Sequence, residues 1–154
     1  MIKTLFVIFS FHSTSSFAEN VTEIQPLSFG TLALRDNLST YQYTITFAGD
    51  VSIDPAFIII NSGHPAEYLL SEFPANQQLN INIMVPDVGT ELSGEIDPST
   101  SQFTISNHHS FAPTVTTNQL GEAVINIGGT LSTSGSGFYK DATYFNTMTI
   151  IVSY

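Results

Sequence analysis

The chain has 154 residues and no cysteine; 10% of the residues are charged, 42% are hydrophobic and 12% are aromatic. Its formal net charge of −10 comes from 13 acidic and only 3 basic residues, which excludes nucleic acid as a partner because phosphate backbones are bound through Lys and Arg. The hydrophobic fraction is too high for a disordered polyanion, and the lack of thiols excludes disulfides, thiol catalysis and thiolate metal sites.

The N-terminal residues 1–18 have the three parts of a secretory signal peptide: Lys3 near the start, an apolar run over 5–11, and Ser16-Phe17-Ala18 as a small-x-small cleavage site. The run is far shorter than the ~20 residues that span a bilayer. Removal of 18 residues from 154 leaves 136, which predicts one domain over 19–154. This exported part keeps 2 basic and 13 acidic residues, so its charge is 2 − 13 = −11. We expect no membrane insertion after signal removal.

Alternation of apolar and polar residues predicts strands along most of the exported part. Tyr41, Tyr43, Ile45 and Phe47 alternate with polar residues, and the pattern ends at the turn residues Gly49-Asp50. The same period of two recurs over 79–85, 103–106, 124–131 and 147–154. Residues 56–60 instead form a continuous apolar run, which is typical of a central strand covered on both faces.

Residues 65–73 fit two kinds of element. The apolar residues Ala66, Leu69, Leu70 and Phe73 have helical spacing, with Pro65 suited to the first helical position and Pro74 able to end the helix. The segment is short, so a strand remains open, but on spacing alone a helix is slightly favoured.

Together these patterns predict an all-β fold, an antiparallel β-sandwich or barrel of about eight strands, with at most one short helix near 65–73. Gly128-Gly129 lies inside a strand pattern, which indicates a bulge or a close backbone approach. Tyr139, before the last strand, is placed to bury its ring and bond an upstream backbone group, like a tyrosine corner.

The sequence assigns no catalytic, cofactor-binding or metal-binding residue, and we expect no cofactor. Neighbouring His108 and His109 would point to opposite faces of a strand, so they suit an exposed loop better than one metal ion. His64 beside Pro65 is expected to be structural or exposed. Acids that were considered for hydrolysis or calcium binding lie in turn-rich stretches without the required spacing: Asp50, Asp54, Glu91, Glu95 and Asp97.

Several short motifs resemble the bacterial domain-of-unknown-function 4402 family of secreted proteins. They are Leu27-Ser28-Phe29-Gly30-Thr31, Pro65-Ala66-Glu67-Tyr68, Ile127-Gly128-Gly129-Thr130-Leu131, Gly137-Phe138-Tyr139 and Ile150-Ile151-Val152-Ser153-Tyr154. The Gly-x-Tyr motif before a final alternating strand is also similar to chaperone–usher pilin subunits of the spore-coat-U-like group.

The resemblance implies an immunoglobulin-like sandwich, a strand around Tyr68, and no catalytic residues. Pilin-like subunits complete their sandwich with a strand from a neighbouring molecule. By that analogy, residues 21–29 are the candidate donor strand, and residues 148–154 are the candidate docking edge or a core strand.

The function that we expect is a secreted, non-enzymatic structural or adhesive surface component, fimbria-like, that associates with itself or another surface protein through an edge strand. It would reside in the periplasm, on the cell surface or outside the cell. The alternative is a carbohydrate- or small-ligand-binding module, with Phe111, Tyr139, Tyr144 and Phe145 as the aromatics available to stack on a ligand. An enzyme is disfavoured because no set of acid–base groups is predicted to converge.

Overall fold

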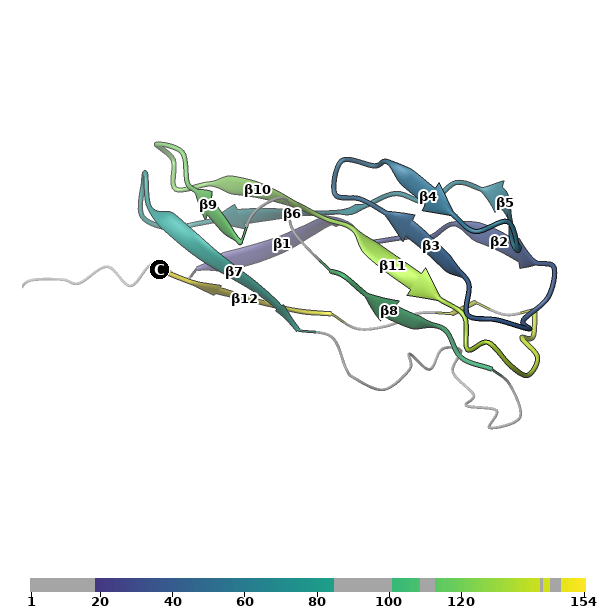
Figure 1. Cartoon of the computed structure of the whole chain (residues 1–154). Helices are drawn as coiled ribbons and strands as arrows, with labels where there is room; N and C mark the ends of the chain where they lie inside the picture. Colours follow the sequence, from purple (N-terminus) through teal and green to yellow (C-terminus); the bar gives the residue numbers. More distant parts are fainter. Residues whose placement is uncertain (1–18, 85–100, 109–112, 142, 145–147) are drawn as a thin grey trace, which may run out of the picture.

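The computed structural model describes residues 19–84, 101–108, 113–141, 143–144 and 148–154. Within these ranges there are twelve β-strands in antiparallel sheets and no helix (Figure 1). The strands are β1 (Asn20–Gln25), β2 (Thr31–Leu34), β3 (Gln42–Ile45), β4 (Val51–Ile53), β5 (Phe57–Asn61), β6 (Ala66–Ser71), β7 (Gln78–Met84), β8 (Thr104–Ser106), β9 (Thr114–Thr116), β10 (Ala123–Ile127), β11 (Gly129–Ser132) and β12 (Thr149–Ser153).

The predicted all-β sandwich class is confirmed, but the count of about eight strands is too low. Some long alternating runs of the sequence form two strands instead of one. The run over 124–131, for example, is divided into β10 and β11, where the chain changes its pairing partner from β6 to β3.

The β1–β6 and β2–β5 pairings lie in separate sheets that are linked by an isolated bridge between Ser28 and His64, whose two backbone bonds measure 3.0 and 2.8 Å. Each pairing has one register shift, between Glu23 and Gln25 in the first and between Thr31 and Leu32 in the second.

Glycines permit close approaches between backbone segments. A Cβ on Gly63 would lie 2.1 Å from the Ser28 carbonyl oxygen, and one on Gly30, whose φ is +76°, would lie 2.2 Å from the Asn61 oxygen. At Gly128 a Cβ would lie 2.2 Å from the Ile45 oxygen, so only glycine lets β10 bend away from β6 and continue as β11 beside β3. The close approach predicted at Gly128-Gly129 is thus confirmed for Gly128.

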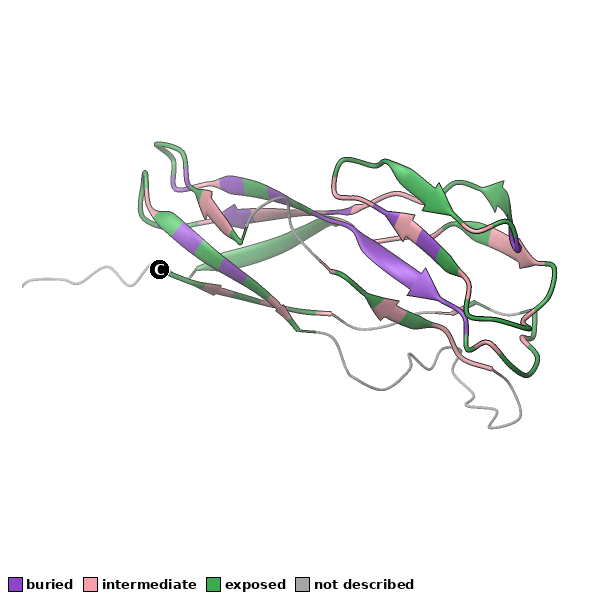
Figure 2. Cartoon of the chain, viewed as in Figure 1, coloured by how far each residue is buried: buried purple, intermediate pink, exposed green. Residues whose placement is uncertain are grey.

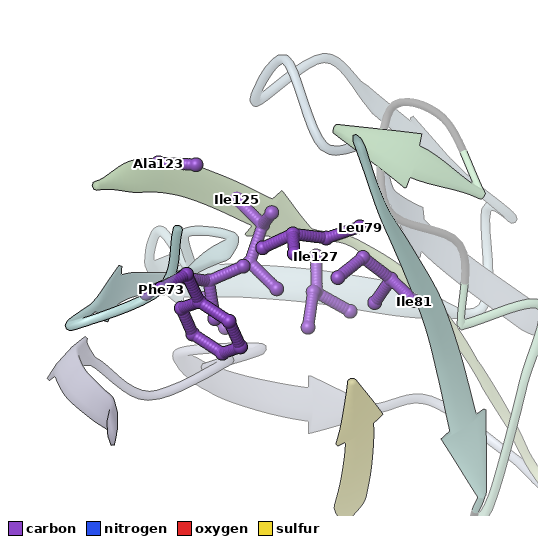
Figure 3. Packing of buried hydrophobic residues seen from close by; sticks show 8 residues of the cluster. Phe73, Leu79, Ile81, Ala123, Ile125 and Ile127 are labelled. Carbon is purple, nitrogen blue, oxygen red and sulfur yellow. The ribbon is translucent and has the colours of Figure 1, made fainter. Parts of the chain in front are cut away.

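Two hydrophobic clusters lie at opposite ends of the elongated molecule. The first is enclosed by β1-β6-β10 and β12-β7-β9, and Figure 3 shows its side chains converging. It contains Ala66, Leu70, Phe73, Leu79, Ile81, Ala123, Ile125 and Ile127. The second lies between β4-β3-β11-β8 and β2-β5 and is built on Tyr43, Ile45, Phe57 and Leu131. The alternation predicted for these segments therefore separates core from surface.

The helical interpretation of 65–73 is wrong, and the strand around Tyr68 is confirmed. These residues include β6, which is hydrogen-bonded on one side to β1 and on the other to β10. Ala66 and Leu70 are buried and Leu69 is half-buried, while Phe73 lies beyond the strand, after Glu72 at φ +66°. Pairing on both sides has overridden a helix of only two turns.

The expectation that residues 56–60 form a strand covered on both faces is also wrong. Strand β5 lies in a two-stranded sheet with β2, and Ile58, Ile59 and Ile60 are 44%, 38% and 60% exposed. Figure 2 shows β4 and most of β5 as exposed strands at one end of the molecule. An apolar run of the kind found in sheet interiors is therefore on the surface.

Candidate functional site

The sandwich is open along the flank where β4 and β5 meet. Val51 and Ile53 pair with Ile45 and Tyr43, so their side chains point to the core face of the sheet. Both nevertheless remain exposed, at 46% and 36%. Ile59 is opposite the half-buried Leu32 and also points inward. We call this region the β4–β5 flank.

The flank is open because β10 ends its pairing with β6 at Ile127–Ala66. Had β10 continued straight, it would have run alongside β5. At Gly128 the chain crosses to the other layer instead, and there β11 pairs with β3 and β8. The place next to β5 on the side away from β2 has no strand among the described residues.

The backbone of β5 has hydrogen-bonding groups directed at that vacant place. The Arg35 N–H donates to the Ala56 oxygen at 2.9 Å, which fixes the side on which β2 lies. In an antiparallel ladder alternate residues face alternate sides, and the Phe57 N–H indeed turns the other way, donating to the Asp54 oxygen at 3.1 Å. Ile59 shares that outward side, so its N–H and C=O point away from β2.

A second flank lies between β1 and β12, the edge strands that the sequence suggested for association. The candidate donor, residues 21–29, is paired over residues 21–25 along β6 of its own chain, as part of strand β1. Strand β12 pairs with β7 on one side only, and Ile150 and Val152 pack partly buried against the first cluster. The β12 segment is thus both a core strand and an edge strand.

Tyrosine–carboxylate bonds run along the β1–β12 flank. The Tyr68 hydroxyl donates to Glu23 at 2.9 Å, and the Tyr154 hydroxyl donates to Glu19 at 2.6 Å. The Tyr154 ring packs edge-on against Phe73, with centroids 6.1 Å apart. This flank therefore carries two acids and a set of side-chain contacts, whereas β5 has no charged residue.

The phenol pKa values reflect these bonds. Burial, the hydrogen bond to Glu23 and the charge of that carboxylate raise the pKa of Tyr68 to about 12. The hydrogen bond to Glu19 raises the pKa of Tyr154 above its usual value. Both phenols therefore stay protonated and donate their bonds throughout the neutral range.

The aromatics considered for ligand stacking are divided between described and other residues. Tyr139 stacks on Phe103 with centroids 4.2 Å apart, and Tyr144 meets Phe103 edge-on at 5.0 Å. Phe111 and Phe145 lie outside the described residues. Tyr139 and Tyr144 thus turn their rings to this intramolecular cluster rather than to a free face.

The Tyr139 hydroxyl has the role expected of a tyrosine corner. It accepts the backbone N–H of Ser134 at 2.8 Å and donates to the Gln102 oxygen at 3.0 Å. Asn37 anchors the same loop by donating to Ser134 Oγ at 2.9 Å and accepting the Gly135 N–H at 3.1 Å. These bonds join the end of β11 to the chain that leads into β8.

Two of the remaining titratable candidates that the structure describes are engaged in contacts with the backbone. His64 makes the backbone bridge to Ser28, and Asp54 accepts the Gln42 N–H at 2.7 Å. His109, Glu91, Glu95 and Asp97 lie outside the described residues. Within the described ranges, no three His, Cys, Asp or Glu residues are grouped to hold a metal ion, and no helix is long and apolar enough to cross a membrane.

Comparison of the chain with protein-family models, curated proteins and solved structures gives no match. The resemblances drawn from short motifs therefore stay predictions. The sequence shows the uncharged run of isoleucines but does not predict the β4–β5 flank. No local pattern shows that β10 leaves the sheet before reaching it.

Proposed function

We propose that the protein is a secreted, non-enzymatic structural or adhesive surface component that associates by adding a strand to an open sheet edge. The observation that carries this proposal is the β4–β5 flank. There, inward-facing apolar side chains stay exposed beside a strand that is paired on one side only among the described residues. Natural sheets protect such edges with charges, prolines or a covering segment, because an open edge recruits other chains.

Strand addition fits the chemistry of this edge. Main-chain hydrogen bonds would supply affinity, and alternate side chains of the added strand would fill the gap between the two layers. Val51, Ile53 and Ile59 would be removed from water, at roughly 25 cal/mol for each Å² of apolar surface buried. The protein would then act as a building unit or an attachment point rather than as a catalyst.

The export part of the proposal rests on residues 1–18, with their basic start, apolar middle and small-residue cleavage site. The test follows the full chain in the cells that produce it. We expect mass spectrometry to find a chain that begins at Glu19, and immunogold labelling of intact cells to find it at the surface. A protein that keeps residues 1–18 and stays inside the cell would contradict the proposal.

The assembly part is tested on the purified exported chain, residues 19–154. Sedimentation velocity over a range of concentrations should show species larger than the monomer that grow with concentration. A strictly monomeric protein at the highest soluble concentration, together with no labelling of surface structures, would overturn the assembly role.

A further inference from the structure

We propose that β5 is a self-docking edge: it pairs antiparallel with β5 of a second copy of this chain, with Ile59 of one copy opposite Ile59 of the other. This rests on the proposed function, association through a strand edge, and adds to it the strand, the partner and the register. The two copies would be related by a two-fold axis, the commonest symmetry of soluble oligomers.

The composition of β5 does not match its exposed position. A continuous β-branched run is characteristic of strands covered on both faces. Here, Ile58 and Ile60 lie on the outer face of a two-stranded sheet, and Ile59 lies at the open flank of the second hydrophobic cluster. An antiparallel strand alongside β5 would place its own side chains beside Ile58 and Ile60 on the outer face and beside Ile59 on the inner face.

Among the described residues, strand β5 has space beside it on the side away from β2, and its backbone groups are directed toward that space. The place that β10 would fill is vacated at Gly128, and the alternation of the β2–β5 ladder, counted from the Arg35–Ala56 bond, directs the N–H and C=O of Ile59 toward it. An antiparallel partner centred on Ile59 exchanges both backbone bonds between the two Ile59 residues. The added strand would extend the sheet formed by β2 and β5.

The isoleucine triplet of β5 is symmetric about Ile59. Centring the pair there puts Ile58 of each copy opposite Ile60 of the other, on the same face of the new ladder. Each isoleucine of the triplet then meets an isoleucine. This self-complementarity favours a second copy of β5 over an unrelated strand.

The lack of charged side chains around β5 also favours a second copy of the chain as its partner. Two copies, each with a formal charge of −11 after loss of residues 1–18, repel each other unless they meet at an uncharged surface. Residues 55–63 contain no charged side chain. The antiparallel arrangement also brings Asp54 of one copy toward the Asn61–His64 end of the other, whereas a parallel one would place the two Asp54 carboxylates together.

The β1–β12 flank is less suited to self-docking. Glu19 and Glu23 lie along it, so a second acidic copy would approach two carboxylates. The Tyr154 ring on Phe73 and the Tyr154–Glu19 bond already occupy its end. Within the part of the chain that the structure describes, no equivalent contact covers the open side of β5.

The register is tested by cysteine cross-linking, for which the chain offers a background free of thiols. Ile58→Cys and Ile60→Cys are made separately in the exported chain, mixed, and oxidised under mild conditions. Residues opposite each other in a non-hydrogen-bonded pair lie about 4.5 Å apart at Cα, within disulfide range. We expect the mixed 58–60 disulfide to form several-fold faster than either disulfide between identical variants. Equal rates, or no cross-linking, would overturn the register.

The edge is tested with a charge substitution and a matched control. Ile60→Lys places a cation next to the centre of the proposed pair, opposite Ile58 of the other copy, and Ile151→Lys places one on β12, at a residue that is also exposed. We expect Ile60→Lys to weaken self-association in sedimentation at least tenfold and Ile151→Lys to leave it nearly unchanged. Circular dichroism checks that both variants keep their β-structure. The opposite result would transfer the docking edge to β12 and overturn the inference.

Failure of this inference is distinguishable from failure of the proposed function. If Ile60→Lys abolishes the dimer in solution and lowers surface labelling, the proposed function and the inference about β5 are both supported. If surface labelling persists in cells while no 58–60 disulfide forms, another edge makes the assembly and the inference about β5 falls alone.

Discussion

Tyr43 combines complete burial with a hydroxyl that has no hydrogen-bond partner among the described residues. Its ring lies in the second cluster, edge-on to Phe29 at 5.7 Å and tilted against Phe57 at 6.3 Å. The ring supplies the packing, while burial of an unpaired hydroxyl costs about 1–3 kcal/mol.

We therefore expect Tyr43→Phe to leave the free energy of unfolding unchanged or to raise it by about 1 kcal/mol, because the ring stays and the unpaired hydroxyl goes. Urea unfolding of both proteins measures the change. Tyr43→Leu, which removes the ring, is the control and should destabilise. A loss of more than about 1 kcal/mol in Tyr43→Phe would mean that the hydroxyl makes a stabilising bond.

Gly128 is the residue on which the crossing of β10 to β11 depends. A methyl group there would lie 2.2 Å from the Ile45 oxygen and 2.6 Å from the Thr46 carbonyl carbon, so the two backbones would have to separate. We expect Gly128→Ala to lower the free energy of unfolding by about 3 kcal/mol or more.

The control for Gly128→Ala is Gly49→Ala. Gly49 has φ +87° but no atom within 4 Å of an added Cβ, so only backbone strain of about 1–2 kcal/mol is expected. Thermal or urea unfolding compares the two variants. An equal or smaller loss at Gly128 would contradict the close approach.

At the scale of elements, the bond between Tyr68 and Glu23 fastens β1 to β6. The pKa of Tyr68 is raised from 10.0 to about 12 in the folded protein, so the proton is held more tightly there than in the unfolded chain. The tighter binding of this proton by folded Tyr68 contributes stability that is fully present below about pH 10 and is lost as the pH rises through about 12.

We therefore expect wild-type stability to fall between about pH 10 and pH 12, and Tyr68→Phe to show a smaller fall over that range. Urea midpoints at about pH 8 and at about pH 11 measure the difference. Tyr41 and Tyr154 also have raised pKa values, so part of the alkaline loss remains in the variant. An identical loss in both proteins would contradict a raised pKa of Tyr68 in the folded protein.

Particular elements show what local sequence could predict. The alternation of Tyr43 and Ile45, and of Leu79 and Ile81, reports one buried and one exposed face, and β3 and β7 confirm it. Residues 65–73 mislead because pairing with β1 and β10, which lie far apart in the sequence, decides their conformation.

The open edge could not be predicted, since it depends on where another strand goes. Residues 56–60 have the composition of a covered strand, and only the departure of β10 at Gly128 leaves β5 exposed. The pairing of residues 21–29, the suggested donor, could not be predicted for the same reason. The sequence does not show that residues 20–25 pair with β6 of the same chain.

At the scale of the whole molecule, the two ends differ in how their flanks are covered. At the first cluster, Tyr68 and Tyr154 bond the acids of the N-terminal segment. At the second, the inward-facing Val51, Ile53 and Ile59 remain exposed beside an uncharged strand. We therefore expect association at the end of the molecule that holds β4 and β5.

Amide hydrogen exchange tests this claim most directly, because the Ile59 N–H points to solvent in the monomer and would be bonded in the pair. Exchange followed by NMR should be fast at Ile59 in dilute protein and at least tenfold slower at about millimolar concentration, while Leu70 in the doubly paired β6 stays protected throughout. Fast exchange at Ile59 that does not change with concentration, in a sample that still associates, would contradict the account.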